Sequence, residues 1–367
     1  MDPFSQAALG AVVGQVVGHR TLGYRAAAYG ALAGALPDID VLFSLNGDFV
    51  DQLVTHRGIT HSLFFAPVVG PLLGWLVWKW TARAGPDTGA RERNCWMLVI
   101  TLALLSHPLL DLLTPYGTQL MLPFSDARFA INAMPIIDPV YTLLLGAGLL
   151  VAWLPRLRRR LRASTVAAVT LAISTGYLGY GWLQNVRAEA AAAAQLSAAG
   201  IGWERLSAFP TILQVHLRRI VVRSADADRV GFYSTWSPCE ITWYPAPRTA
   251  GEVYAPFLRT RAGRVFDWFA MGWAHYAVVA GSAGTFLQAS DLRYGFDDDP
   301  LDSVFTVSVA IDPSGVPLGP ALAGRSTPPD AERALARLVT ETYAPACQLF
   351  TGGVIPQHMD QNGPQHE

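Results

Sequence analysis

Residues 163–186 read ASTVAAVTLAISTGYLGYGWLQNV and contain no Asp, Glu, Lys or Arg. A helix of about 20 apolar residues spans the hydrocarbon core of a bilayer, so this run predicts a membrane-spanning helix. Three further runs without formal charge lie at residues 58–78, 94–110 and 139–155. Because four such runs are rare in soluble proteins, the sequence predicts a multi-pass helical membrane domain, with a very apolar soluble bundle as the alternative.

The composition agrees with a membrane protein. The 367-residue chain is 51% hydrophobic and 15% charged, whereas soluble domains are typically about 25% charged. Its formal net charge of −1 gives no reason to expect a nucleic-acid partner. Cys95, Cys239 and Cys347 have no zinc-finger spacing, and the sequence leaves open whether Cys239 and Cys347 pair in an oxidising compartment.

Two shorter uncharged runs precede these candidate spans, at residues 3–19 and 26–37. Both are rich in Ala and Gly, and small residues permit close contact between helices in a membrane bundle. Each run is short for a spanning helix. We therefore expect two shallow or half-buried helices there.

The charged loops indicate an orientation. Residues 156–162, RLRRRLR, are basic, and residues 79–93 also carry an excess of basic side chains. Basic loops lie on the cytoplasmic side of bacterial membranes. The loops at the opposite helix ends are rich in Asp. This pattern places those loops, and the chain after the last span, on the extracytoplasmic side of the membrane.

A change of composition after residue 187 predicts a second domain. Runs rich in Val, Ile, Tyr and Phe are typical of β-strands, and they lie at 211–222, 231–236, 240–244, 274–280 and 304–311. Helical patterns lie at 251–270 and 329–343. The predicted fold is thus a multi-pass α-helical membrane domain (1–187), a smaller soluble α+β domain (188–352) and a disordered tail (353–367).

Ionisable side chains cluster in two short stretches at the ends of apolar runs. The first, PDIDVLFSLNGDFVDQLVTHRGITHS at 37–62, contains Asp38, Asp40, His56, Arg57 and His61. The second contains His107 and Asp111, which lie one turn apart on one face of a helix. Ionisable groups at membrane depth cost about 2.5–3.5 kcal/mol and usually mark a function. We expect the two stretches to meet in space.

Imidazole and carboxylate are the ligands that zinc, manganese and iron accept. The predicted metal ligands are Asp38, Asp40, His56, His61, His107 and Asp111. The metal would be a divalent ion, with Zn²⁺ favoured over Mn²⁺ or Fe²⁺, and there are ligands enough for one or two ions. Asp40, His61 and Arg57 are the predicted catalytic residues, with Arg57 as the clamp for an anion.

Simpler interpretations exist for single residues. Either Asp could cap a helix or lie in a solvated loop, and Arg57 could anchor a helix end at the interface. His56 or His61 alone would more often be a loop or core histidine than a ligand. The complete set in two windows at one membrane face favours a metal site.

These motifs resemble a known family. PDID at 37–40, HRGITHS at 56–62, HPLLDLLTPYGTQLMLPFSD at 107–126 and IDPVYT at 137–142 are similar to the bacterial membrane-bound metal-dependent hydrolases, also called YdjM-like or LexA-binding inner-membrane-associated hydrolases. The opening at 2–14 is similar too, although many members carry His where this chain has Gln6. The pair at His107 and Asp111 also resembles the zinc-cluster ligands of phospholipase C enzymes.

The sequence therefore predicts an integral membrane metal-dependent hydrolase. A site at the bilayer surface suggests a phosphoester or ester of an amphiphilic, lipid-like substrate, cleaved by metal-activated water. The alternative is a non-enzymatic membrane scaffold or partner-binding protein with a structural metal. A transporter is a third interpretation, disfavoured because the polar residues lie at helix ends.

Overall fold

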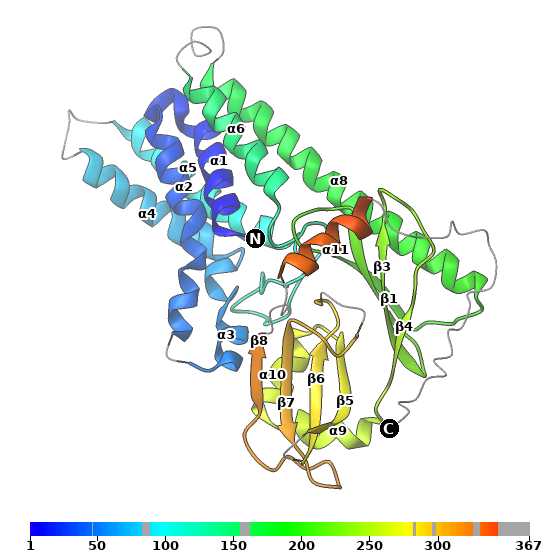
Figure 1. Ribbon diagram of the computed structural model, residues 1–367. Helices are drawn as coiled ribbons and strands as arrows, with labels where there is room; N and C mark the ends of the chain where they lie inside the picture. Colours follow the sequence, from blue (N-terminus) through cyan, green and yellow to red (C-terminus); the bar gives the residue numbers. More distant parts are fainter. Residues whose placement is uncertain are drawn as a thin grey trace.

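The computed structural model describes residues 1–45, 47–82, 89–154, 162–281, 284–295, 299–325 and 331–343. It confirms the predicted order of a helical domain followed by a region of antiparallel sheets (Figure 1). The tail at 353–367 lies outside the described residues, as does all but Arg162 of the arginine-rich run at 156–162.

The helical domain holds the metal-ligand candidates at the ends of its helices. Its elements are α1 (Pro3–Leu22), α2 (Arg25–Ala35), the 3₁₀ helix η1 (Leu36–Ser44), α3 (Phe49–Thr55), the short 3₁₀ helix η2 (Ile59–His61), α4 (Phe65–Ala82), α5 (Ala90–Asp111), α6 (Pro139–Trp153) and α8 (Ala163–Ala198).

Among the described residues, three helices are long and apolar enough to cross a membrane: Arg25–Ser44, Ala90–Asp111 and Ala163–Ala198. The bent pair Phe49–His61 and Phe65–Thr81, with 64° between its parts, makes a fourth if it counts as one span. The predicted spans at 94–110 and 163–186 lie within two of these helices, and the one at 58–78 overlaps the bent pair.

Two expectations differ from the structure. The run at 139–155 forms the shorter apolar helix α6. The run at 26–37, expected to be shallow, continues through η1 and makes a helix of spanning length. Pro37 does not break it, because a proline in the first turn of η1 lacks only an N–H that would be unpaired there. The charges of Asp38 and Asp40 hid this continuity in the sequence.

A seam of glycines allows α1 and α2 to touch backbone to backbone. A Cβ atom at Gly10 would lie 2.3 Å from the carbonyl oxygen of Gly30, and one at Gly14 would lie 2.2 Å from that of Ala26. No side chain fits at such distances. The close contact expected from the small residues of these two runs is therefore present, and it fixes α2 and η1 against α1.

The C-terminal region contains two four-stranded antiparallel sheets. The first has the order β1 (Arg205–Pro210), β2 (Leu217–Arg223), β3 (Ala227–Ser234) and β4 (Tyr244–Pro247), and the second has the order β5 (Ala274–Gly281), β6 (Gly284–Asp291), β7 (Phe305–Ala310) and β8 (Leu322–Arg325). The helices α9 (Gly251–Leu258) and α10 (Arg261–Phe269) lie between the sheets in sequence, and α11 (Ala331–Tyr343) follows them. The strand expected at 240–244 is mostly irregular, and β1, β6 and β8 were not predicted.

The helix α8 joins the two domains. It passes the predicted boundary at 187/188 without a break, and its end packs Ala188, Ala192 and Leu196 onto Ile220 and Val222 of the first sheet. Figure 1 shows α8 running from the helical bundle to this sheet, with α11 beside it.

Arg218 of β2 fastens the first sheet to the helical domain. Its guanidinium is fully buried and donates to the carbonyl oxygens of Asn132 (3.0 Å), Ala133 (3.0 Å) and Gly181 (2.7 Å). It also donates to Val215 O and Asn185 Oδ1. Burial lowers the pKa of Arg218 to about 9, which leaves the guanidinium charged at neutral pH.

The second sheet is fastened by other buried arginines. Arg293, which follows β6, donates to Pro115 O of the helical domain at 2.8 Å and is paired with Asp291. Arg128 donates to the carbonyl oxygens of Leu53, Tyr116 and Gly117 within the helical domain, and its guanidinium lies over the rings of Trp268 and Phe269 of α10. Tyr116 and Leu53 belong to the same apolar cluster as Phe269 and Phe305. Both sheets are thus held against the end of the helical domain that carries the ionisable residues.

The substitution Gly14→Ala tests the helix seam. The new methyl group would overlap the Ala26 carbonyl, and overpacking of this kind costs about 1–3 kcal/mol. We expect a lower midpoint of thermal unfolding in detergent. The control is Gly146→Ala in α6, where a Cβ meets nothing within 4 Å; its midpoint should stay the same or rise.

The substitution Arg218→Met tests the domain junction. It keeps an apolar stem but leaves three buried carbonyl oxygens without their donor, and a buried unpaired group costs about 1–3 kcal/mol. We expect faster release of the C-terminal domain in limited proteolysis. Arg229→Met, which removes only a pair with the exposed Asp226, should be cleaved like the wild type.

Candidate metal centre

Three segments bring the ionisable residues together. η1 carries Asp38 and Asp40. The turn after α3 carries His56 and Arg57, and η2, which follows it, carries His61. The end of α5 carries His107 and Asp111. His61, His107 and Asp111 are completely buried, Asp40 is nearly so, and Asp38 is half-buried. The two stretches of the sequence therefore meet, as expected.

Four side chains form a first group: Asp38, His61, His107 and Asp111. His61 Nε2 lies 3.6 Å from Asp38 Oδ1 and 3.3 Å from Asp111 Oδ2. His107 Nε2 lies 3.4 Å and 3.5 Å from the same two oxygens. Two imidazole nitrogens and two carboxylate oxygens thus alternate around one point.

These nitrogen–oxygen distances fit donors that share one metal ion, and all four donor atoms lie within 4.8 Å of one another. Donors about 2.1 Å from one zinc ion stand about 3.4 Å apart at the corners of a tetrahedron. Within the part of the chain that the structure describes, His61 Nε2, His107 Nε2 and Asp111 Oδ2 are buried without a hydrogen-bond partner. Buried polar atoms without a partner are rare and require an explanation. A cation shared by the four donors supplies one.

The other ring nitrogens orient the two imidazoles. His107 Nδ1 donates to the carbonyl oxygen of Gly34 at 2.6 Å, a carbonyl near the end of α2. His61 Nδ1 lies 3.1 Å from Asp40 Oδ2 and 3.0 Å from Thr60 Oγ1. With the proton on Nδ1, each ring presents the lone pair of Nε2 to the centre, as metal-binding histidines do.

A second group consists of Asp38, Asp40 and His56, and it shares Asp38 with the first. His56 Nδ1 lies 2.9 Å from Asp40 Oδ1, while Asp40 Oδ2 accepts from the backbone N–H of Arg57 and from Thr60. Asp40 therefore touches both His56 and His61. It can orient the two rings, or it can hold a second ion together with Asp38 and His56.

Arg57 reaches the centre from an unusual backbone position. Its φ of 62° lies in the left-handed region, which non-glycine residues rarely adopt and which often marks a functional site. The guanidinium lies 3.2 Å from Asp111 Oδ2, donates to Thr114 Oγ1 at 2.7 Å and stacks over Tyr116. It thus supplies positive charge at the edge of the donor group.

The structure adds residues that were not identified as part of the site. The amino group of Met1 contacts Asp111 Oδ1, and Gln6 Nε2 donates to the same oxygen at 3.0 Å. Gln6 stands where relatives of the resembled family carry His, and this was the only sequence signal for it. Thr114 and Tyr116 lie in the family-like motif at 107–126, but the sequence assigned them no role, because their contribution depends on how the loop after α5 folds back.

All six predicted ligands lie in these two groups, and Arg57 lies beside them. Their binding of a metal, and the catalytic roles of Asp40, Arg57 and His61, remain predictions.

Comparison with known proteins gives two kinds of match. A family model described as "YdjM inner membrane protein" matches residues 1–188. The inner membrane protein YbcI of Escherichia coli is 34% identical over 163 residues, which cover 41% of this chain and 90% of YbcI. The uncharacterized protein YfhP of Bacillus subtilis is 31% identical over 133 residues, 35% of this chain and 37% of YfhP. No solved structure matches.

Loss of one donor should empty the first group. In the His61→Ala variant only three donors remain, and Asp111 loses a neighbour that balances its charge. We expect about one divalent ion per wild-type chain after purification with zinc, and a small fraction of that in the variant, measured by elemental analysis. His216→Ala changes a half-buried histidine of the C-terminal region outside both groups, and it should retain the wild-type metal content. Equal metal in His61→Ala and wild type would contradict the assignment.

Proposed function

Because the chain belongs to the YdjM inner membrane protein family, we propose that it is a membrane-embedded metal-dependent hydrolase. Its substrate would be a phosphoester or ester of an amphiphilic, lipid-like molecule. The observation that carries the proposal is the group of four donor atoms, spaced at 3.3–3.6 Å, with three of them buried and lacking hydrogen-bond partners.

A bound divalent ion would polarise the substrate oxygen and lower the pKa of a water molecule to about 7. The residues of the chain do the remaining work. Arg57 is placed to hold an anionic group, because its guanidinium borders the donor group and is steadied by Thr114. Asp40 keeps His61 and His56 in their orientations through its two oxygens.

His56 has a distinct position among the predicted ligands. Its side chain is 25% exposed, whereas those of His61 and His107 are not exposed at all. It lies in the second group and also against the cavity between the two domains. In our proposal His56 either binds a second ion or transfers a proton. Asp40 is its partner in both cases.

The resemblance to zinc phospholipase C enzymes rests on the pair His107 and Asp111. The nature of the metal, zinc in our proposal, follows from the balanced nitrogen and oxygen donors and from their spacing.

A structural metal in a non-enzymatic scaffold is the second candidate function. One observation favours it: the first group offers four protein donors, the number that fills a structural zinc site, whereas catalytic zinc keeps an open position. The half-exposed Asp38 is the donor that could shift toward the second group and open a position.

The extracytoplasmic placement of the site is also a proposal. It rests on the basic loops and on Cys239, which is disulfide-bonded, while Cys95 within α5 is a free thiol. Cys347 lies outside the described residues. Disulfides persist in oxidising compartments such as the bacterial periplasm. The C-terminal region, and with it the loops that it covers, would then lie on that side.

Two variants test the hydrolase. The assay uses purified full-length protein in detergent with zinc, manganese or iron(II), offered chromogenic phosphodiesters, phosphomonoesters and carboxylic esters. We expect His61→Ala to lose metal and activity together. Asp40→Asn should retain the ion at saturating metal but lose about 10–100-fold in activity, as when the partner of a metal-ligating histidine is removed.

The control is Asp226→Asn, which alters an exposed carboxylate of the C-terminal region and should leave the activity unchanged. The scaffold would be supported instead by two results together: the wild-type protein holds metal but cleaves none of these substrates, and removal of the metal by a chelator lowers its stability.

A further inference from the structure

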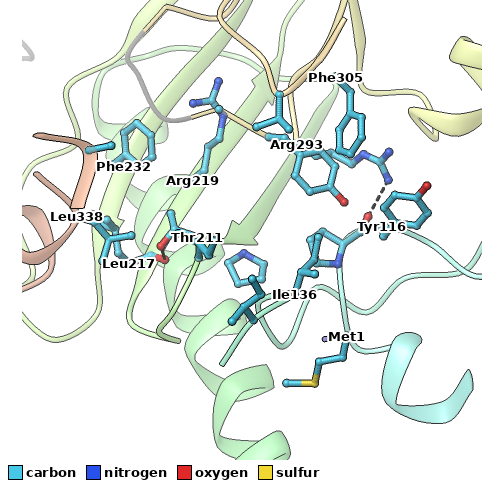
Figure 2. A pocket seen from close by; sticks show the side chains of 18 of the residues that line it. Met1, Tyr116, Ile136, Thr211, Leu217, Arg219, Phe232, Arg293, Phe305 and Leu338 are labelled. Carbon is cyan, nitrogen blue, oxygen red and sulfur yellow. Dashed lines mark hydrogen bonds between the residues drawn. The ribbon is translucent and has the colours of Figure 1, made fainter. Parts of the chain in front are cut away.

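A cavity of about 310 Å³ lies between the helical domain and both sheets. Its volume is at the lower end of the range of ligand pockets, about 300–1,000 Å³. Figure 2 shows that side chains from separate parts of the chain enclose it, with Met1 and Tyr116 from the helical domain facing Leu217, Phe232 and Leu338 from the C-terminal region.

One end of the cavity reaches the proposed metal centre. Met1, His56 and Arg57 line it there. Met1 and Arg57 both contact Asp111, and His56 contacts Asp40. The cavity therefore meets the centre on the side of its partly exposed histidine and its arginine.

The opposite end combines an apolar wall with charged side chains. Arg219, Arg337 and Glu341 also line the cavity, and the guanidinium carbons of the two arginines lie 5.5 Å and 5.7 Å from the centre of the Phe232 ring. Phe232 of β3, Leu217 of β2 and Leu338 of α11 form the apolar wall (Figure 2), and Ile212 belongs to the same lining. α11 is fixed over this end because Ser234 and Ser237 donate to the carbonyl oxygens of Thr342 and Tyr343. The apolar wall is therefore a built part of the fold, made by a helix anchored at its C-terminal end.

We propose that this cavity binds the hydrocarbon chain of an anionic amphiphile, with the anionic group at the His56 and Arg57 end. The inference rests on the proposed function for the identity of that group. The new element is that the C-terminal region determines which substrates fit. Leu338, Phe232 and Leu217 limit the length of the hydrocarbon chain.

The physical basis is that the cavity joins the cationic side chains next to the proposed metal centre to an apolar wall. A cation at one end favours a phosphate or carboxylate. Each methylene group that enters the apolar end strengthens binding by about fourfold. A ligand with one charged end and one hydrocarbon chain uses both ends, whereas a small anion uses only the first.

The experiment measures binding of butyl phosphate and dodecyl phosphate to the full chain in nanodiscs, by equilibrium dialysis of radiolabelled ligand. Binding to protein-free nanodiscs is subtracted. We expect the wild type to bind dodecyl phosphate at least about 100-fold more tightly than butyl phosphate. Leu338→Trp, which fills the apolar end, should reduce this ratio at least tenfold without weakening butyl phosphate binding.

The matched control is Leu335→Trp, on the same helix but exposed and outside the lining. It should keep the wild-type ratio. Ile212→Trp fills the cavity from a loop and should act as Leu338→Trp does, which covers the case that a change in α11 disturbs folding. An unchanged ratio in both filling variants would overturn the proposal.

His61→Ala separates this proposal from the proposed function. If the metal centre holds the phosphate, the variant weakens both ligands equally and the ratio stays the same. If His61→Ala binds both ligands as tightly as the wild type, the metal-centred function is wrong. The ratio of the two affinities in Leu338→Trp and Ile212→Trp then still decides whether the cavity holds a hydrocarbon chain.

Discussion

The burial of Asp111 at the end of an apolar helix is the constraint on which the site depends. A carboxylate removed from water is stable only if charges or hydrogen bonds replace its hydration. One oxygen has the Met1 amino group and Gln6, and the other faces Arg57 and two imidazoles. These partners come from three segments: the N-terminus with α1, the turn before η2 with η2 itself, and α5. All three segments are therefore drawn to one point. The convergence of the donors follows from this requirement.

Buried arginines extend the same principle to the C-terminal region. Arg218 donates to the carbonyl oxygens of Asn132, Ala133 and Gly181, and Arg293 donates to that of Pro115, so both bind backbone groups of the helical domain. Directional bonds of this kind fix the sheets in one position, which apolar contact alone does not do. The cavity between the domains therefore has a defined shape, and its apolar wall stands at a constant distance from the metal centre.

The sequence was sufficient for the features that arise from composition. An uncharged run of spanning length identifies α8, and ionisable residues beside apolar runs identify Asp38, His61, His107 and Asp111 as a group. The expectation from sequence was wrong where charged residues interrupt a helix. Asp38 and Asp40 made the continuation of α2 through η1 look like a loop. Features made by long-range folding had no signal: the donation from His107 to Gly34, the role of Arg218 and the cavity all join segments far apart in the chain.

The choice between a catalytic and a structural metal depends on Asp38. The other three donors of the first group are completely buried and oriented by Gly34, Asp40, Gln6 and Arg57, so they form a rigid triangle. Asp38 alone is partly exposed, and it alone belongs to both groups. If Asp38 turns toward the second group, the proposed metal would have a position open for water or substrate, next to His56 and the cavity. A purely structural metal needs no arginine or partly exposed histidine at the mouth of a cavity, so these two residues favour the catalytic proposal over the scaffold.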